Sequence, residues 1–227
     1  MKKAFTLLEL IFVIVVIGII AAVAIPRMKS NSLREAAAQV LGHIRYTQHL
    51  AMSSDVYKDT DEEWYKKRWQ IKFSNVGGSD DMWAYAIFYD RTADGNPNAS
   101  ETAINPSDMT KKLTGGYSGT IEYDDKEATQ TLNLGHAYNV RDIDFEDCNI
   151  NNNDHKKRIV FDYLGRPLTD SPKNLVNSFE TSSKNLLLNK TCKIKLCSVD
   201  DCIDANEDQQ VVISIQKETG YAEIIEN

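Results

Sequence analysis

A single carboxylate interrupts an otherwise apolar stretch near the N-terminus. Of the 21 positions in residues 5–25, 18 are apolar, and the exceptions are Thr6, Glu9 and Gly18. A charged side chain inside a membrane helix costs ~2.5–3.5 kcal/mol on insertion scales, so it usually has a function. Glu9 is therefore the first candidate for a functional side chain. The alternative is an acid that snorkels to the membrane interface.

The second reactive group is a set of four cysteines in the last 80 residues of the chain: Cys148, Cys192, Cys197 and Cys202. Because the apolar N-terminus implies export, disulfides are the favoured interpretation, with free buried thiols as the alternative. Zinc is disfavoured, because the spacing lacks a Cys-x-x-Cys pair and no histidine lies nearby in sequence. Three connectivities are possible, and the sequence does not choose among them. We favour Cys197–Cys202 as a tight loop and Cys148–Cys192 between two strands.

The remaining polar side chains form no recognised catalytic pattern. The histidines make no metal-ligand pair of known spacing: His43, His49, His136 and His155. No nucleophile elbow, zinc-protease motif or phosphate-binding loop occurs. Asp90, Asp94 and Asn96 could offer oxygen ligands to Ca²⁺, although Asp and Asn are also ordinary turn residues. We therefore expect no enzyme activity, no cofactor and no metal, with calcium in this loop as the weak alternative.

The apolar stretch is long enough to cross a membrane. As a helix, residues 5–25 would span ~31 Å, about one bilayer core. Lys2 and Lys3 favour a cytoplasmic N-terminus. A cleaved signal peptide fits Ala22-Val23-Ala24, but the apolar region is longer than usual and contains Glu9. A plain signal anchor explains the length and the lysines, but not the carboxylate.

A third interpretation accounts for the carboxylate. Lys3-Ala4-Phe5-Thr6-Leu7-Leu8-Glu9, followed by apolar residues up to Pro26, resembles the class III signal of type IV pilins and pseudopilins. The resemblance implies that a prepilin peptidase cuts between Ala4 and Phe5 and that the new amine of Phe5 is methylated. Ala4 departs from the family pattern, in which glycine is usual, so cleavage efficiency is the property this departure affects.

The resemblance also assigns assembly roles within the apolar stretch. It implies that Glu9 pairs with the terminal amine of a neighbouring subunit and sets axial register, and that the stretch from Gly18 to Pro26 unwinds in filaments. Pro26 lacks an amide hydrogen and clashes with the carbonyl of Ala22, so we expect a kink there. Gly18 weakens a helix by ~1 kcal/mol relative to alanine. The alternative for Gly18 is close approach of another helix.

After Pro26, the pattern changes to an amphipathic helix. Ser32-Leu33-Arg34-Glu35 has the form of a capping box, and apolar residues recur at helical spacing over residues 33–53. The complete spine would contain about 50 residues and measure ~75 Å. We divide the chain into a leader (1–4), a transmembrane and filament-core helix (5–26), an amphipathic second half (27–55) and a periplasmic β-rich domain (56–227).

Strand signals dominate the rest of the chain. Alternation and turn residues predict strands at 69–73, 83–89, 118–123, 131–134, 140–145, 157–162, 186–188 and 193–196. A final hairpin, 211–216 with 221–225, turns at Gly220. Residues 90–116 are rich in turn formers and predict a long surface insertion. The expected fold class is α+β and pilin-like, with a long N-terminal helical spine packed on an antiparallel β-sheet domain.

Two C-terminal motifs narrow the resemblance. Phe161-Asp162-x-x-Gly165-Arg166-Pro167 ends a strand, and Thr219-Gly220 turns the last hairpin. This order is similar to that of the GspH/FimT-type minor pseudopilins. The resemblance implies a structural subunit of a type II secretion pseudopilus or a type IV pilus, placed in the inner membrane with one span and a periplasmic domain. Its partners would be other pilins or pseudopilins in a filament, the prepilin peptidase and the inner-membrane assembly platform.

Some FimT-like relatives bind DNA, and the charge of the chain bears on this alternative. Beyond Pro26 the chain has 24 Lys and Arg against 32 Asp and Glu, a balance of −8. An acidic surface is a poor generic partner for nucleic acid. Gly220 is followed by Tyr-Ala-Glu rather than by basic residues, and residues 155–158 form the best remaining basic patch. The sequence therefore disfavours a DNA receptor, and it does not choose between secretion and pilus systems.

Overall fold

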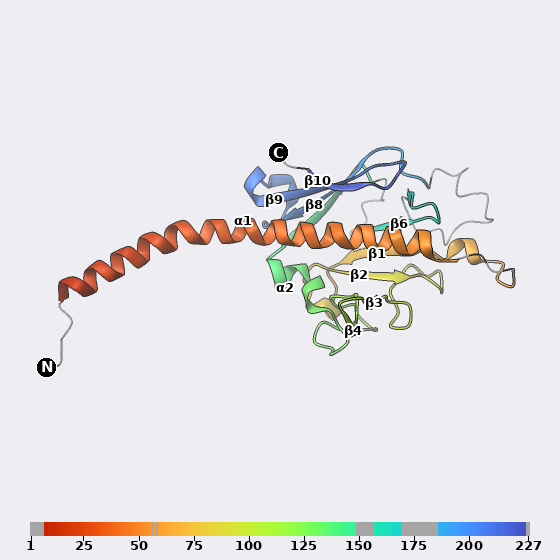
Figure 1. The fold of residues 1–227 in the computed structure, drawn as a ribbon, viewed down its shortest axis with the longest axis horizontal. Helices are drawn as coiled ribbons and strands as arrows, with labels where there is room; N and C mark the ends of the chain where they lie inside the picture. The colour runs from red at the N-terminus through yellow and green to blue at the C-terminus, as the bar shows by residue number, and fades with distance from the viewer. Residues whose placement is uncertain (1–6, 56, 58, 149–156, 169–185, 226–227) are drawn as a thin grey trace.

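A single helix forms the spine of the molecule (Figure 1). The computed structural model describes residues 7–55, 57, 59–148, 157–168 and 186–225, and over 21–31 only the backbone. Helix α1 covers Leu7–Ser53, 47 residues without a break. Its backbone stays helical through Pro26, and Figure 1 shows its N-terminal part curving away from the line of the packed part. The predicted α+β fold with a helical spine is confirmed.

Two antiparallel sheets pack on the same helix, whereas the sequence predicted one. The first sheet has the order β2-β1-β6-β7, with β1 Trp69–Ser74, β2 Ala84–Tyr89, β6 Lys157–Phe161 and β7 Pro167–Leu168. The second has the order β10-β9-β8-β5, with β5 Asp142–Glu146, β8 Cys192–Cys197, β9 Gln210–Ile215 and β10 Ala222–Ile225. Helix α1 contacts β1 and β6 of the first and β8, β9 and β10 of the second.

The C-terminal half of α1 is buried along one stripe. These side chains are at most 3% exposed: Leu33, Ala36, Ala37, Val40, Ile44 and Ala51. Their spacing of three and four residues places them on one face of the helix. They share one core with apolar side chains of both sheets, such as Ile71 and Phe73 of β1 and Ile213 and Ile215 of β9. The alanines allow close approach of the helix to strands that carry larger side chains.

The capping box predicted at Ser32–Glu35 was wrong. Helix α1 continues through Ser32, and an N-cap residue must have non-helical backbone angles. The Ser32 hydroxyl instead donates to the carbonyl oxygen of Tyr138, at 3.2 Å. A sequence that could start a helix therefore serves here as a contact between the helix and the domain.

The prediction of a long surface insertion at 90–116 was wrong. This segment contains a short hairpin, β3 Ile104–Asn105 with β4 Asp108–Lys112, and its flanks extend the first sheet along β2. Isolated bridges join Phe88 to Thr102 and Ala86 to Thr114, and Leu113 is fully buried. The many turn residues hid these short pairings, because bridges of one residue leave no alternating pattern to detect.

Three other strand predictions also failed. Residues 118–123 form turns, and residues 131–134 lie in the 3₁₀-helix η3 Gln130–Leu132 and at the start of helix α2 Leu134–Tyr138. The Asn133 side chain caps α2 by accepting from the backbone N–H of His136, at 3.0 Å, which favours helix over strand. Residues 186–188 provide only a bridge between Leu187 and Leu168. The remaining 3₁₀-helices described are η1 Trp64–Lys66, η2 Gly77–Ser79, η5 Cys202–Asp204 and η6 Glu207–Gln209.

The other strand predictions were confirmed. Strands β1 and β2 pair in antiparallel register, with Ile71 opposite Ile87. The final hairpin pairs Ile213 with Ile224 and turns with Gly220 at φ +68°. This left-handed backbone conformation favours glycine, because glycine lacks the Cβ that would clash.

Candidate functional site

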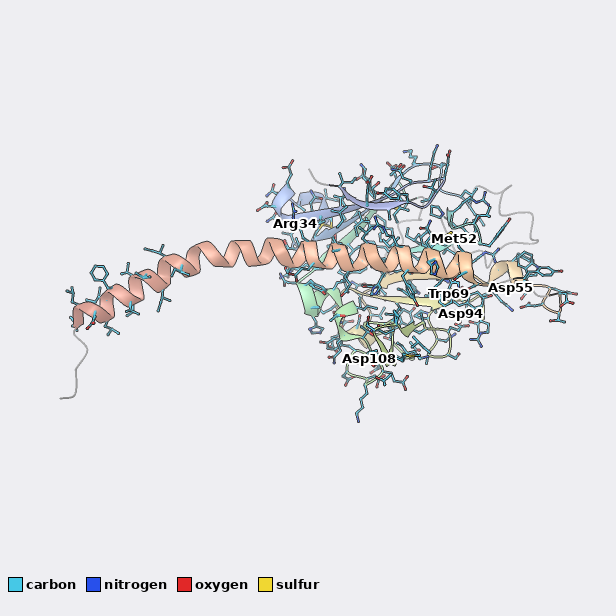
Figure 2. All side chains as sticks on the ribbon, in the orientation of Figure 1. Arg34, Met52, Asp55, Trp69, Asp94 and Asp108 are labelled. Carbon is cyan, nitrogen blue, oxygen red and sulfur yellow. A yellow bond between two sulfur atoms is a disulfide. The ribbon has the colours of Figure 1, made fainter. Side chains whose placement is uncertain are left out.

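The N-terminal part of α1 is an apolar surface that the described part of the domain leaves uncovered. We name residues 7–20 the exposed segment. Its twelve large apolar side chains are between 45% and 78% exposed: Leu7, Leu8, Leu10, Ile11, Phe12, Val13, Ile14, Val15, Val16, Ile17, Ile19 and Ile20. Figure 2 shows side chains projecting from this part of the ribbon on opposite sides. A helix that is apolar all round is stable only when something else buries it.

The predicted assembly residues lie on or beside the exposed segment. Glu9 is in the first turn of α1 and is exposed. Gly18 has open space around it, because a Cβ built there would meet no atom within 4 Å. Pro26 lies in helical backbone. The predicted cleavage position at Ala4 and Phe5 lies outside the described residues, so its geometry is untested.

The second half of the helix is attached to the first sheet by a partly buried polar chain of hydrogen-bonded side chains. We name residues 33–51 the packed segment. The His43 ring nitrogen Nδ1 lies 2.6 Å from the Tyr85 hydroxyl, which also accepts from Gln39 Nε2 at 2.9 Å. The Tyr138 hydroxyl donates to Gln39 Oε1, at 2.9 Å. Since Gln39 occupies an acceptor site of the Tyr85 oxygen, the Tyr85 hydrogen is free to point at His43.

Burial shifts the pKa of all three titratable groups of this hydrogen-bonded set. It raises the pKa of Tyr138, raises the pKa of Tyr85 far above its usual value and lowers the pKa of His43, because the charged form of each would lose hydration. A neutral His43 that accepts from Tyr85 carries its proton on Nε2. Hydrogen bonds between uncharged side chains therefore fix the helix against β2 and α2.

The same helix meets the two C-terminal motifs at its far end. Gln48 Nε2 donates to the carbonyl oxygens of Gly165 and Thr219, both at 2.8 Å. Arg45 Nη2 donates to the carbonyl oxygen of Ala222, at 2.7 Å. A Cβ on Gly220 would lie 2.5 Å from the Gly165 oxygen, so only glycine fits between the two turns. Segments separated by more than 50 residues thus converge on one helical turn.

The Asp162 side chain organises the first of these motifs. It is 1% exposed, and its Oδ1 accepts from the backbone N–H groups of Leu164 and Arg166, at 3.0 and 2.8 Å. Its Oδ2 accepts from Arg166 Nε, at 2.7 Å. Gly165 has φ +78°, as the turn requires. The motif is therefore a turn that presents the Gly165 carbonyl to the helix.

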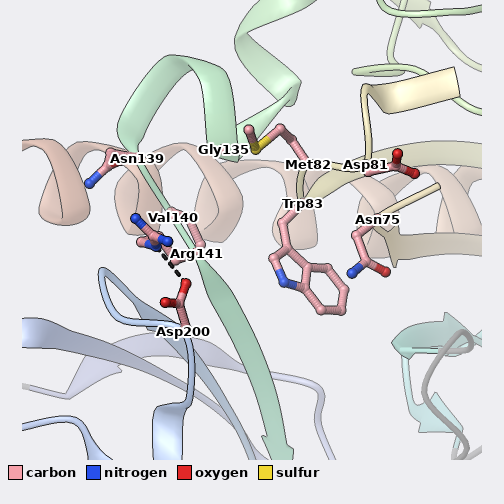
Figure 3. A pocket seen from close by; sticks show the side chains of 9 residues that line it. All are labelled: Asn75, Asp81, Met82, Trp83, Gly135, Asn139, Val140, Arg141 and Asp200. Carbon is pink, nitrogen blue, oxygen red and sulfur yellow. Dashed lines mark hydrogen bonds and ion pairs between the residues drawn. The ribbon is translucent and has the colours of Figure 1, made fainter. Parts of the chain in front are cut away.

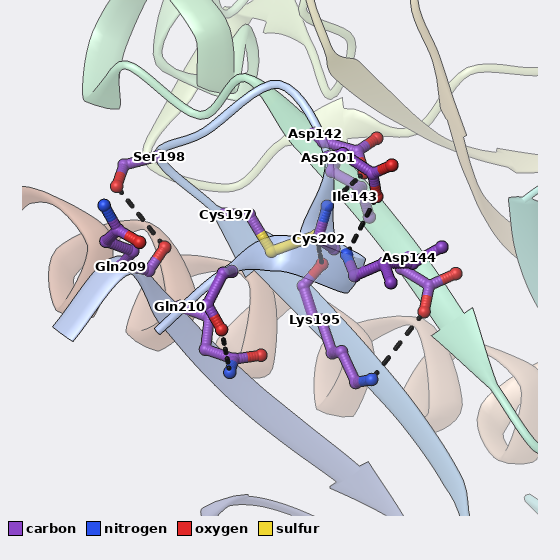
Figure 4. Close-up of a disulfide and its surroundings, with 12 residues drawn as sticks. Asp142, Ile143, Asp144, Lys195, Cys197, Ser198, Asp201, Cys202, Gln209 and Gln210 are labelled. Atoms are coloured by element: carbon purple, nitrogen blue, oxygen red, sulfur yellow. Dashed lines mark hydrogen bonds and ion pairs between the residues drawn. A yellow bond between two sulfur atoms is a disulfide. The ribbon is translucent and has the colours of Figure 1, made fainter. Parts of the chain in front are cut away.

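The favoured disulfide connectivity was confirmed. Cys148 pairs with Cys192, and Cys197 pairs with Cys202. The first bond joins the chain just after β5 to the start of β8, its antiparallel neighbour. The second closes the loop after β8 (Figure 4), where the Cys202 N–H also donates to Asp142 Oδ2 at 3.0 Å. Both bonds fasten the second sheet.

The weak calcium candidates already have protein partners. Asp90 is fully buried, and its carboxylate accepts from Gln70 Nε2 and from the backbone N–H groups of Asp94 and Gly95. Asn96 Oδ1 accepts from Lys72 Nζ, at 2.7 Å. Among the described residues, no group of three or more His, Cys, Asp and Glu side chains could hold a metal ion.

The best basic patch of the sequence does not form a continuous surface. Arg158 is 3% exposed and donates through Nη1 to the carbonyl oxygen of Gly95, at 3.0 Å. Lys157 Nζ donates to the carbonyl oxygen of Ile143 and lies 4.9 Å from the centre of the Trp83 ring. Two of the four basic-patch residues are therefore used inside the protein. His155 and Lys156 lie outside the described part of the chain.

Residues 1–25 match the model of the prokaryotic N-terminal methylation motif. The match supports a type IV pilin-like family. A prepilin-type motif implies processing by a prepilin peptidase and assembly with other pilins, and it suggests a membrane-anchored protein. In the part of the chain that the structure describes, no helix combines the length and the apolar character needed to cross a membrane. No curated protein and no solved structure matches the chain.

Sequence reasoning missed the polar chain that holds the helix. Gln39, His43 and Tyr85 are separated by up to 46 residues, and nothing in their local pattern connects them. The available signal was weak: His43 and Gln39 are four residues apart, so they share a helix face. Their common partner became visible only in the tertiary structure.

Proposed function

We propose that this chain is a structural minor subunit of a type II secretion pseudopilus or a type IV pilus and has no catalytic activity. It is inserted in the inner membrane by residues 5–26, with its C-terminal domain in the periplasm. A prepilin peptidase removes residues 1–4 and methylates the amine of Phe5. The inner-membrane assembly platform then transfers the subunit from the membrane to a helical filament of pilins or pseudopilins.

One observation carries this proposal: the methylation motif lies on an apolar helical segment that the domain leaves uncovered. The apolar stripe of the packed segment of the same helix is buried against two sheets. A membrane or the helices of neighbouring subunits would supply the missing cover. These two environments are the ones through which a pilin subunit passes.

Glu9 has the proposed role of pairing with the Phe5 amine of a neighbouring subunit. A carboxylate exposed on an apolar helix gains most from a cation when both are removed from water. Gly18 and Pro26 would allow the helix to unwind between them, because glycine and proline are the poorest helix formers. The surrounding Ile and Val side chains would then pack against other helices.

The narrower assignment to the GspH/FimT type rests on the C-terminal motifs. It is supported by the convergence of Gly165, Thr219 and Gly220 on Gln48, since this contact gives the two motifs one shared structural purpose. The DNA-receptor alternative has less support. Lys157 and Arg158 are used internally, and the chain has a net charge of −7.

Mass spectrometry of the mature N-terminus tests the class of protein. The full chain is expressed with and without a prepilin peptidase in the same membrane. We expect a chain that begins at Phe5 and carries one extra methyl group only when the peptidase is present. A mature chain that begins at Ile25 would instead identify a cleaved secretory signal, and the proposal would be wrong.

A charge-neutral variant tests the assembly role. Glu9→Gln keeps the side-chain shape and removes the charge, and Glu35→Gln is the matched control on the packed segment. We expect Glu9→Gln to be processed at Phe5 but largely absent from sheared filaments, while Glu35→Gln enters them normally. Normal incorporation of Glu9→Gln would exclude the proposed pairing. Deletion strains compared for secretion, twitching and DNA uptake then identify the system.

A further inference from the structure

A pocket of about 290 Å³ lies where the two sheets approach each other (Figure 3). One wall is the connection between β1 and β2, and the other is formed by the α2–β5 connection and the loop after β8. Its polar lining includes Asn75, Asp81, Asn139, Arg141 and Asp200, and Met82 and Trp83 provide apolar surface. The volume is near the lower end of the ~300–1,000 Å³ that is typical of small-molecule sites. The pocket therefore suits a ligand of one ring.

Several polar side chains of this pocket have unused hydrogen-bonding capacity. The Asn75 and Asn139 amides and the Asp81 carboxylate make no hydrogen bond or ion pair with another described residue. Arg141 Nε contacts Asp200 Oδ1 at 2.6 Å, and its two other nitrogens contact no described residue. The pocket thus offers donors and acceptors in several directions at once.

Trp83 supplies an aromatic wall. Its side chain is 7% exposed, and Lys157 Nζ lies 4.9 Å from the ring centre, so one position against the ring is already taken by a cation. In Figure 3 the indole nitrogen is turned toward the side of the pocket where Arg141 and Asp200 lie. The indole N–H has no described acceptor and is a further donor for a ligand.

The loop that carries Asp81 has a costly backbone. Asp80 and Asp81 both have left-handed conformations, with φ of 57° and 55°. Backbone strain of this kind is concentrated at functional sites. The Asp80 carboxylate lies 3.1 Å from His136 Nε2. The Asp81 side chain has no contact of this kind, although its backbone is held so that it lines the pocket.

We propose that this pocket binds a neutral pyranose sugar. Carboxamide, carboxylate and guanidinium groups each present two polar atoms in one plane, and adjacent sugar hydroxyls both donate and accept. The Trp83 ring and the Met82 side chain supply apolar contact for the C–H groups of a sugar ring. An anion would meet Asp81 and Asp200, and a cation would meet Arg141. A neutral ligand with many hydroxyls therefore fits this lining best.

The test uses the full chain in a detergent without a sugar headgroup. Glucose and N-acetylglucosamine are the probes, and sorbitol provides hydroxyls without a ring. Saturation-transfer NMR and tryptophan fluorescence measure binding. We expect saturable binding of at least one sugar with a Kd on the order of 1 mM, and weaker binding of sorbitol. No saturable binding of either sugar, or equal binding of sorbitol, would overturn the proposal.

Variants locate the binding. Asn75→Ala and Arg141→Ala should each weaken it by about tenfold, the usual effect of losing one hydrogen bond. Arg91→Ala is the matched control, because Arg91 is exposed and donates to the carbonyl oxygen of Ser100 outside the pocket. Trp83→Phe keeps an aromatic ring and removes the N–H. It still tests the pocket if the two alanine variants do not fold. Sugar binding that is unchanged in all three pocket variants would show that the sugar binds elsewhere.

Discussion

The exposed and packed segments of α1 have the same secondary structure and opposite environments. In the exposed segment, Leu7 and Ile14 are 78% and 61% exposed. In the packed segment, Val40 and Ile44 are fully buried. Polar side chains of the same segment contact both sheets, His43 through Tyr85 of β2 and Arg45 through the carbonyl oxygen of Ala222 in β10. One continuous helix therefore contains a surface that is complete within the subunit and a surface that is not.

The difference shows that the two halves are stabilised by different partners. The packed segment buries one stripe, which the two sheets and helix α2 cover. The exposed segment is apolar on every side, so no single domain could cover it. Soluble monomers rarely keep such large apolar patches open, and patches of this kind mark protein or membrane contacts. The domain thus holds one half of the helix so that the other half can project.

The largest expected effect comes from truncating one side chain in each segment. Ile44→Ala should lower the free energy of unfolding by about 2–5 kcal/mol, because it leaves a cavity in the core. Ile14→Ala should change it by less than about 0.5 kcal/mol in detergent, because the Ile14 side chain is 61% exposed. Urea unfolding followed by tryptophan fluorescence measures both. Equal losses would contradict the contrast between the segments.

The same glycine substitution should have opposite results in the two regions. Gly220→Ala places a Cβ 2.5 Å from the Gly165 oxygen at a positive φ, and should cost about 2–3 kcal/mol. Gly18→Ala meets no atom within 4 Å and should favour the helix by ~1 kcal/mol. Thermal unfolding checks the first, and helix content by circular dichroism checks the second. A stabilising Gly220→Ala would refute the close contact at the helix end.

Removing one hydroxyl tests the polar chain that holds the packed segment. Tyr85→Phe should cost about 1–2 kcal/mol, because the half-buried His43 and Gln39 side chains each lose a hydrogen bond to the buried Tyr85 hydroxyl. Tyr57→Phe is the control, because Tyr57 is 62% exposed. The free energy of unfolding of this variant should equal that of the unmodified protein. Unfolding in urea compares the two variants. An unchanged free energy of unfolding in Tyr85→Phe would mean that these hydrogen bonds contribute no net stability.

The smallest effect is a pH dependence that belongs to the packed segment. Burial lowers the folded-state pKa of His43 below 6.5, so the unfolded state binds the proton first as pH falls. His43 therefore leaves stability unaffected above pH 6.5 and reduces it below, by at most about 1.4 kcal/mol per pH unit. His43→Gln should remove this slope, whereas His49→Gln, at an exposed position, should keep it. Urea midpoints across this range provide the measurement.

Periodicity and turn chemistry explain which predictions succeeded. The helix stripe, the β1–β2 pair and the Gly220 hairpin are local patterns, and local patterns determine which face of an element is apolar. The strand predicted at 131–134 failed because the cap at Asn133 favours a helix. The insertion at 90–116 failed because its pairings are one short hairpin, β3 with β4, and single bridges. The disulfide preference was correct, although only spatial proximity distinguishes three connectivities.

The sequence by itself determined that the chain has an apolar N-terminal helix with one carboxylate, an amphipathic continuation and a β-rich remainder. These properties depend on residue type and spacing along one chain. Only the tertiary structure decided that two sheets share the helix, that Gln48 joins the two C-terminal motifs, and that Trp83 and Arg141 line one pocket. Such contacts join residues far apart in sequence. Their geometry depends on how the whole core packs, and the spacing of residues along the chain does not determine that packing.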